Sequence, residues 1–162
     1  MSQATSVQSI TPVLAFKQGT EEAVNLYVSL FPNSRVVNLV RSDDGAGGHV
    51  LVANFELDGR PYNAFDGGEH FAFSDGFSMM VTCETQEEID RLWDALTAGG
   101  GEPGPCGWLK DRFGMSWQVI PSDLGRMLSD TVAGNTQRAG EAMRQMTKLD
   151  IATLRAAYES AA

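Results

Sequence analysis

The amino-acid sequence predicts an α+β fold built from two βαβββ modules and a C-terminal helical tail. Strand and helix patterns follow one another in the order β, α, β, β, β over residues 10–65, and the beginning and end of this order recur over residues 77–120. After Pro121 the composition changes to helix formers. Apolar residues make up 43% of the 162 residues, so the chain is long and apolar enough to bury a core.

The first module opens with a strand and a helix. Residues 10–16 form an apolar run, ITPVLAF, which the sequence KQG ends. From Thr20 onward, apolar residues recur at the i, i+3, i+4, i+7, i+8 spacing of one helical face, until Pro32 interrupts the pattern. This face consists of Ala23, Leu26, Tyr27, Leu30 and Phe31. An apolar helical face of this kind is expected to pack on a sheet.

Three strands complete the first module. They are predicted by the β-branched or alternating runs at residues 35–41, 49–58 and 60–65. Asp58-Gly59, between the last two runs, is a typical hairpin turn. The glycine-rich segment at residues 42–48 predicts a flexible hairpin connection between the first two.

The second module repeats this scheme with a shorter stretch between its helix and its final strand. Residues 77–84 predict a strand. Thr85 and Glu88 form a capping box that opens a helix, whose apolar residues are Ile89, Leu92, Trp93 and Leu96. Residues 107–121 predict two short strands around a turn at Phe113-Gly114.

The closing strands of the two modules correspond in pattern. Aligning residues 58–65 with residues 113–120 places Asn63 at the position of Gln118, with Tyr62 and Trp117 beside them. A neutral hydrogen-bonding side chain is therefore expected in the middle of the last strand of each module.

Three helical segments are expected after the modules, at residues 124–128, 139–146 and 150–158, with Asp150 as the N-cap of the last. Such a tail either covers an open sheet face or contacts a second subunit. We therefore divide the chain into a flexible N-terminus (1–9), a domain (10–121) with modules at about 10–68 and 76–121, and a helical appendix (122–162).

The charge of the chain argues against a nucleic-acid partner. The formal net charge is −9, the isoelectric point is about 4.6 and the 12 Lys and Arg residues are scattered, whereas phosphate binding needs basic patches. No segment suggests a membrane partner. Residues 1–9 lack the basic and apolar regions of a secretory signal, so a cytoplasmic location is expected.

Several motifs that invite a specific chemistry have simpler explanations. Cys83 and Cys106 form no CxxC pair and are expected to be small core residues, a reactive role for Cys106 being the alternative. The glycines at positions 99, 101 and 104 satisfy GxGxxG but do not open a helix, which predicts a helix-exit loop instead of a nucleotide site. His49 is expected to be exposed. No catalytic triad or pair of carboxylates can be assembled.

The aromatic, methionine and amide residues of the strands are more informative. Six side chains occupy positions that a two-module sheet could direct inward: Asn63, Phe65, Ser78, Met80, Trp108 and Gln118. Together they would form an apolar cleft with a few hydrogen-bonding groups, which is typical of a small-molecule site. His70 is a further candidate for contact with a ligand. The alternative is that these are core residues with satisfied amides.

Five segments carry a resemblance to a known family: FPNSR (31–35), FELDG (55–59), CETQEEIDRLWDAL (83–96), CGWLKDRFGMSWQVIP (106–121) and KLDIATLRAAY (148–158). Over residues 9–159 the chain resembles the PhnB-like branch of the vicinal oxygen chelate superfamily, which includes glyoxalases, bleomycin- and fosfomycin-resistance proteins and extradiol dioxygenases. The resemblance implies cupped mixed sheets (the glyoxalase/bleomycin resistance/dioxygenase fold) and a homodimer.

The resemblance also implies where a metal would be held. Metal-dependent members place His, Gln or Glu ligands on the first and last strand of each module, and these positions fall here on Thr11, Asn63, Ser78 and Gln118. None of the four is a carboxylate or an imidazole, so nothing offsets the charge of a desolvated divalent cation. The resemblance therefore predicts a metal-free protein without a cofactor.

The leading hypothesis is a homodimer that binds a small organic ligand, aromatic or quinone-like, between Trp108, Phe65, Met80 and the amides of Asn63 and Gln118. One alternative is a metal-dependent lyase, isomerase or dioxygenase-like enzyme that uses Gln118 with other ligands, such as His70. Another is methyl transfer, because the branch is often labelled demethylubiquinone methyltransferase-like. The chain has no strand–glycine-rich loop–helix unit for S-adenosylmethionine.

Overall fold

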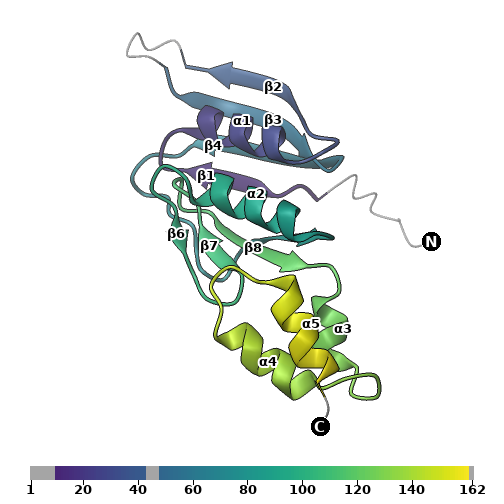
Figure 1. Ribbon diagram of the computed structural model, residues 1–162. Helices are drawn as coiled ribbons and strands as arrows, with labels where there is room; N and C mark the ends of the chain where they lie inside the picture. Colours follow the sequence, from purple (N-terminus) through teal and green to yellow (C-terminus); the bar gives the residue numbers. More distant parts are fainter. Residues whose placement is uncertain (1–9, 43–47, 161–162) are drawn as a thin grey trace, which may run out of the picture. The chain divides into compact units, whose positions relative to one another are not determined.

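The computed structural model describes residues 10–42 and 48–160 (Figure 1). The expected flexible N-terminus at residues 1–9 and most of the glycine-rich connection, residues 43–47, lie outside the described residues. The chain forms two compact units, of which the first ends at Ala72 and the second begins at Phe73. Each unit contains one four-stranded sheet.

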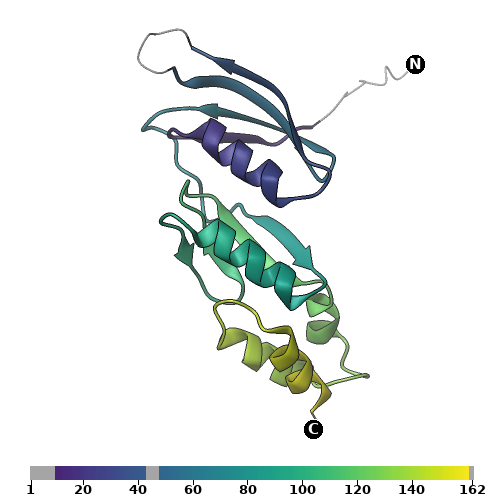
Figure 2. The same cartoon turned by 45° about the horizontal axis from the view of Figure 1, so that its top comes forward.

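The first unit has the predicted βαβββ order. Its elements are β1 (Val13–Phe16), α1 (Thr20–Leu30), β2 (Arg35–Arg41), β3 (Val50–Leu57) and β4 (Arg60–Asp66). The strand order in the sheet is β1-β4-β3-β2, in which β1 is parallel to β4 and the other pairs are antiparallel. Helix α1 packs on one face of this sheet (Figure 2). The core between them consists of Leu14, Phe16, Ala23, Val24, Tyr27, Ala53, Phe55 and Ala64.

Two aspartates fix the ends of strands in the first unit. Asp58 and Gly59 both have positive φ, 49° and 72°, as the predicted tight hairpin between β3 and β4 requires. At the other end of β4, the Asp66 carboxylate accepts hydrogen bonds from the backbone N–H of Thr20 (2.9 Å) and of Val50 (2.8 Å). One side chain thus joins the beginning of α1 and of β3 to the end of β4.

The second unit repeats this topology. Its elements are β5 (Met79–Cys83), α2 (Gln86–Thr97), β6 (Glu102–Pro103), β7 (Trp108–Lys110) and β8 (Ser116–Pro121), with the sheet order β5-β8-β7-β6. The capping box is confirmed, because the Thr85 side chain accepts from the N–H of Glu88 and the Glu88 side chain accepts from that of Thr85. All four predicted apolar residues of α2 are buried, together with Leu109, Trp117 and Val119 of the sheet.

The structure corrects several boundaries. The strand predicted at residues 10–16 begins only at Val13, and the one predicted from residue 77 begins at Met79, so Ser78 precedes its strand. Phe31 is not part of the helix but its extended C-cap. The helix-exit loop is confirmed, yet it contains the two-residue strand β6. Gly101 is needed there because a Cβ would lie 2.7 Å from the Cα of Thr97.

The tail forms three helices, α3 (Leu124–Ser129), α4 (Thr136–Arg144) and α5 (Ile151–Glu159), and Asp150 caps the last as predicted. They share a core of Leu124, Met127, Ala139, Leu149, Leu154 and Tyr158, against which Ile120 of β8 packs. The Gln86 side chain donates to the carbonyl of Leu149 (3.1 Å) and accepts from the N–H of Ile151 (2.9 Å). The tail therefore belongs to the second unit and is held there through α2 and β8.

Candidate functional site

The two predicted amides occupy equivalent positions in the two sheets. In the first sheet Val13 of β1 lies opposite Asn63 of β4, and in the second Met80 of β5 lies opposite Gln118 of β8. Thr11 precedes Val13 by two residues, as Ser78 precedes Met80. The pattern correspondence found in the sequence is thus also a correspondence of strand register.

Gln118 lies on the uncovered side of the second sheet. Trp117 and Val119 are buried beneath α2, so the half-buried Gln118 between them points to the opposite face. We call that face the second open face; it carries Met80, Trp108, Lys110, Ser116 and Gln118. Met80 and Trp108 flank Gln118 on the neighbouring strands, and the Gln118 amide nitrogen donates to the Ser78 hydroxyl at 2.9 Å. No described residue donates a hydrogen bond to the amide oxygen of Gln118.

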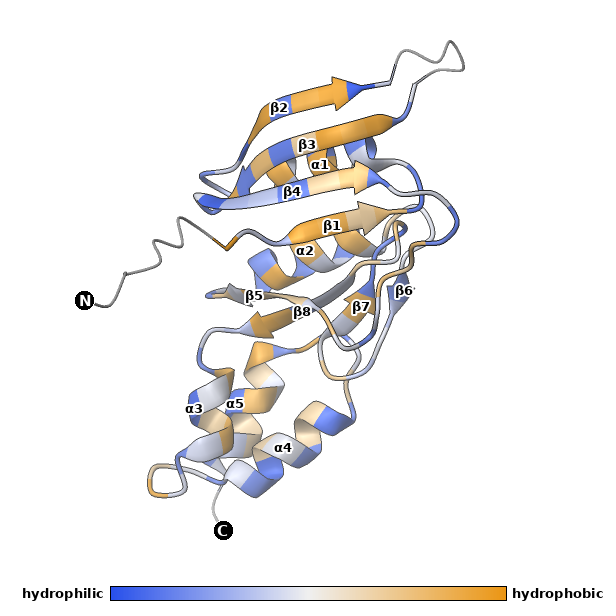
Figure 3. Ribbon diagram, turned by 180° about the vertical axis from the view of Figure 1, so that it is seen from behind, coloured by the Kyte–Doolittle hydropathy of each residue, from blue (hydrophilic) through white to orange (hydrophobic). Residues whose placement is uncertain are grey.

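Asn63 lies on the corresponding face of the first sheet, opposite α1. We call it the first open face; it carries Val13, Asn38, Val40, Val52, Asn54, Asn63 and Phe65. In Figure 3 much of β2 and β3 has the colour of hydrophobic residues. The Asn54 amide donates to the oxygen of Asn63 at 2.7 Å, and the Asn38 amide donates to Asn54 at 3.4 Å. Three strands are thus joined by a row of asparagines.

The remaining predicted contacts are less closely grouped. Phe65 packs edge-on against Phe71, with ring centroids 5.6 Å apart. His70 is exposed in the connection after β4, and Thr11 is half-buried before β1. Within the described residues, neither side chain forms a hydrogen bond or an ion pair with the other predicted contacts. Each unit therefore brings together only its own amide and the neighbours of that amide.

The donor atoms at the four metal-ligand positions do not fit a divalent cation. They are two hydroxyls and two neutral amides, and the oxygen of Asn63 already accepts from Asn54. In the part of the chain that the structure describes, no three His, Cys, Asp or Glu side chains gather where a metal could be held. A desolvated divalent cation would lack the charged oxygen or imidazole ligands that it prefers.

The structure reveals a structural carboxylate that the sequence patterns did not identify. Asp111 is 3% exposed and accepts hydrogen bonds from the N–H of Phe113 (2.9 Å), the N–H of Met115 (3.0 Å) and the indole of Trp117 (2.9 Å). It closes the β7–β8 hairpin and holds the residue next to Gln118. The signal was an Asp three residues before the turn glycine Gly114.

The two cysteines have different surroundings. Cys83 is buried at the end of β5, and burial raises the pKa of its thiol to about 11. Its predicted role as a core residue is confirmed. Cys106 is only partly buried and has a positive φ of 56° in the loop before β7.

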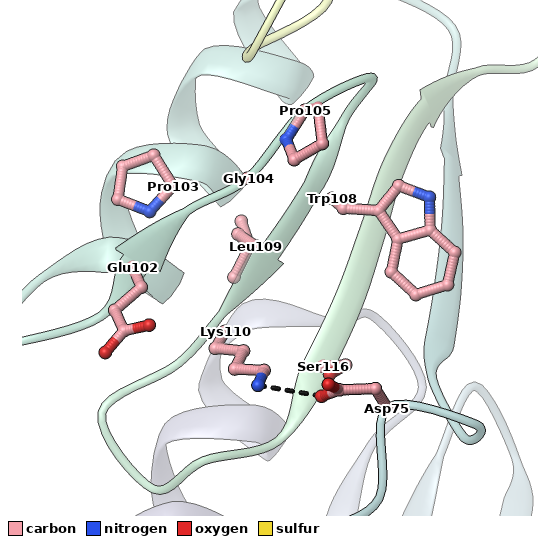
Figure 4. A pocket seen from close by; sticks show the side chains of 9 residues that line it. All are labelled: Asp75, Glu102, Pro103, Gly104, Pro105, Trp108, Leu109, Lys110 and Ser116. Carbon is pink, nitrogen blue, oxygen red and sulfur yellow. Dashed lines mark ion pairs between the residues drawn. The ribbon is translucent and has the colours of Figure 1, made fainter.

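A pocket of about 420 Å³ lies on the second unit, next to Trp108 (Figure 4). Its lining comprises Asp75, Glu102, Pro103, Gly104, Pro105, Trp108, Leu109, Lys110 and Ser116. Of these residues, the sequence patterns predicted only Trp108. The ammonium of Lys110 donates to the Asp75 carboxylate at 2.7 Å.

None of the described helices is long and apolar enough to cross a membrane.

Comparisons with known proteins identify the family. The sequence model of the family 3-demethylubiquinone-9 3-methyltransferase matches residues 8–120, which leaves the helical tail outside the match. The solved PhnB protein of Bacillus cereus is 35% identical, with a TM-score of 0.59, over 70% of this chain and 99% of that one. None of the curated proteins matches.

Two further solved structures share the fold at lower identity. Protein PA1353 from Pseudomonas aeruginosa is 21% identical, with a TM-score of 0.56, over 70% of this chain and 97% of its own. The fosfomycin resistance protein FosX from Listeria monocytogenes is 11% identical, with a TM-score of 0.51, over 72% of this chain and 92% of its own. The chain belongs to the 3-demethylubiquinone-9 3-methyltransferase-like family, the PhnB-like branch of the vicinal oxygen chelate superfamily.

Proposed function

We propose that this protein binds a small organic ligand, aromatic or quinone-like, on its open sheet faces and holds no metal. The observation that carries the proposal is the position of Gln118 between Met80 and Trp108, with its amide nitrogen directed to Ser78. An indole and a thioether offer apolar, polarisable contact surface, and the amide oxygen offers one directed acceptor. This combination suits recognition of an apolar ligand that has a polar group.

The first open face supplies the second part of the proposal. Thr11, Asn63 and Phe65 are proposed ligand contacts there, and His70 is a further one from the connection after β4. The Asn63 oxygen already accepts from Asn54, so this face offers a ligand mainly apolar contact and the remaining amide N–H groups. We therefore assign the leading role to the second open face.

The binding proposal is tested by thermal shifts with a panel of aromatic and quinone-like compounds. A ligand that binds the native state raises the melting temperature in proportion to the logarithm of its concentration. We expect this rise with the wild-type protein and not with Trp108→Ala. Trp93 is buried beneath the sheet and cannot replace Trp108, so a response that persists in Trp108→Ala would place binding elsewhere and contradict the proposal.

The metal-dependent alternative comes from the superfamily. A FosX variant from Listeria monocytogenes, whose structure is 11% identical with a TM-score of 0.50, was solved with Mn(II) and 1S,2S-dihydroxypropylphosphonic acid. Elemental analysis of the purified protein, with thermal shifts against divalent metals, decides between the two functions. Stoichiometric metal that is released by Gln118→Ala would overturn the metal-free proposal.

Methyl transfer is the function that the family description names. Calorimetric titration with S-adenosylmethionine tests it, and we expect no heat of binding. A dissociation constant in the micromolar range would make methyl transfer the better proposal.

We also propose that the protein acts as a homodimer in the cytoplasm. The first open face supports a dimer because Val13, Val40 and Val52 remain 56%, 43% and 40% exposed, and exposed apolar patches mark interaction surfaces. Sedimentation should therefore give twice the chain mass. A mass near 17.5 kDa at micromolar concentration would contradict the dimer.

A further inference from the structure

The second open face continues from Gln118 into the pocket beside Trp108. Ser116 of β8 lies opposite Lys110 of β7, and Lys110 lies opposite Glu102 of β6. This row is two residues along the strands from the row that contains Gln118 and Trp108, so both rows face the same side of the sheet. All the residues that line the pocket belong to the second unit.

The polar groups on the floor of the pocket have spare hydrogen-bond donors. Lys110 carries three N–H donors, and Asp75 accepts from the ammonium at 2.7 Å. Ser116 as a residue is 4% exposed and lines the pocket, and its hydroxyl forms no hydrogen bond to any described residue. Among the described residues only Thr20 has a buried side-chain oxygen without a partner, so the Ser116 oxygen is accessible from the pocket. A ligand oxygen can accept from this hydroxyl and from Lys110 as well.

The charges around the pocket disfavour an anionic ligand, and the Lys110–Asp75 ion pair stands against a cationic one. Asp75 already balances Lys110, while the exposed Glu102 adds a negative charge at the rim. An anion would meet two carboxylates, and a cation would have to compete with Lys110 for Asp75. A neutral acceptor meets no repulsion and leaves the Lys110–Asp75 ion pair in place.

The amine of Lys110 is suited to donate hydrogen bonds and not to attack a carbonyl carbon. The hydrogen bond to Asp75, and then the charges of Asp75 and Glu102, raise the pKa of Lys110 above its ordinary value of 10.5. At neutral pH the group therefore remains an ammonium, which has no lone pair for nucleophilic attack. Binding at this position should be non-covalent.

We propose that the pocket binds neutral aromatic carbonyl compounds, with the ring against Trp108 and the carbonyl oxygen accepting hydrogen bonds from Lys110 and Ser116. Pro103 and Pro105 complete the apolar wall around the ring. The inference rests on the ligand-binding function proposed above and adds the class of the ligand and two of the groups that select it.

Four probes of similar size separate the ligand classes by calorimetry at pH 7: 4-hydroxyacetophenone, 4-ethylphenol, 4-hydroxybenzoate and 4-hydroxybenzylamine. Besides the phenol hydroxyl that all four share, the first carries a ketone and the second no further polar group. The third is an anion and the fourth a cation. The ketone should bind most tightly, about tenfold better than 4-ethylphenol, which corresponds to one hydrogen bond from a charged donor. Tighter binding of the benzoate or the benzylamine would overturn the inference.

Variants of Lys110 and Ser116 test whether these residues cause the preference for the ketone. Lys110→Met keeps the apolar stem and should reduce the affinity for the ketone to that for 4-ethylphenol, while Ser116→Ala should weaken the ketone about threefold to fivefold, as for one neutral hydrogen bond. Lys148→Met is the matched control, because Lys148 forms a similar 2.8 Å ion pair with Asp90 of α2 outside the pocket. It should leave all four affinities unchanged. Each variant is used only after its melting curve matches that of the wild type.

The outcomes separate this inference from the function on which it rests. If all four probes bind equally and Trp108→Ala abolishes their binding, the ligand class is wrong but the binding function stands. An unchanged preference for the ketone in Lys110→Met likewise overturns the role of this pocket. If neither the four probes nor the wider panel binds, both proposals fail.

Discussion

The two sheets have the same strand order and carry an amide at the same position, but the two amides are used differently. In the first sheet Asn63 accepts from Asn54, which accepts from Asn38, so the oxygens of Asn54 and Asn63 already have donors within the sheet. In the second sheet Gln118 donates to Ser78 and lies between Met80 and Trp108. Equivalent positions in a duplicated fold can therefore serve strand cohesion in one copy and the proposed ligand recognition in the other.

The hairpins that carry these amides differ as well. The β3–β4 turn relies on the positive φ of Asp58 and Gly59, whereas the β7–β8 turn is held by the buried carboxylate of Asp111. The first device is a backbone conformation and the second is a set of hydrogen bonds. Substitutions should therefore affect the two hairpins very unequally.

The largest expected effect is that of Asp111→Ala. Removing the carboxylate leaves two backbone N–H groups and an indole N–H without their acceptor, which should lower the free energy of unfolding by about 3 kcal/mol or more. Urea denaturation measures this change. Asp58→Ala in the other hairpin should cost only about 1 kcal/mol, because it places an ordinary side chain in a left-handed conformation.

Asp111→Asn serves as the conservative control for this comparison. Its amide oxygen can still accept from the backbone, but its nitrogen cannot accept from the indole of Trp117. We expect an intermediate loss of stability. Equal losses for Asp58→Ala and Asp111→Ala would show that both hairpins depend on their backbone geometry alone.

The next effect concerns the amides themselves. Asn63→Ala should lower the free energy of unfolding by about 1 kcal/mol, because Asn54 loses its acceptor. Gln118→Ala should change stability by less than about 0.5 kcal/mol, since Gln118 is only half-buried, but should weaken ligand binding about tenfold. Urea denaturation and calorimetry of both variants test this division. If Gln118→Ala proves the more destabilising of the two, the contrast between the faces is wrong.

The smallest effects should appear at opposite ends of the pH scale. In the first sheet, the hydrogen bonds from Arg35 of β2 lower the pKa of Glu56 of β3 below its ordinary value of 4.5. The stability from this pair is present above pH 4.5 and is lost as the pH falls through the lowered pKa. On the second open face, the hydrogen bond to Asp75 raises the pKa of Lys110 above its ordinary value of 10.5. The stability from this pair is present below pH 10.5 and is lost as the pH rises through the raised pKa.

Melting temperatures measured against pH test this opposition. Glu56→Gln should flatten the decline on the acid side and leave the alkaline side unchanged, and Lys110→Met should do the reverse. Both ion pairs are open to solvent, so the shifts should be small and should diminish at high salt. A change on the same side of the profile for both variants would contradict the assignment.

Much of this organisation was predictable from the sequence because it depends on local patterns. The capping box at Thr85, the apolar face of α2 and the Asp58-Gly59 turn are encoded within a few residues, and all are confirmed. The equivalence of Asn63 and Gln118 also followed, since each amide lies at a fixed distance from a turn glycine.

Other features depend on which strands are neighbours and could not be predicted. The asparagine row requires the pairing of β2 with β3, and the pocket requires Asp75 to approach Lys110 from a distant part of the sequence. Strand β6 contains only two residues, one of which is Pro103, so it has no strand pattern. Side-chain partners across strands are set by register, which local composition does not reveal.

The contrast between the two cysteines gives this protein a ready reporter position. Burial keeps the Cys83 thiol protonated at neutral pH, with its pKa raised to about 11, so maleimide and iodoacetamide reagents should spare it. Cys106 is partly exposed and follows Pro105, a residue of the pocket wall. A fluorophore attached to the natural sequence should therefore settle at one place, within reach of arriving ligands, and convert occupancy of the pocket into an optical signal.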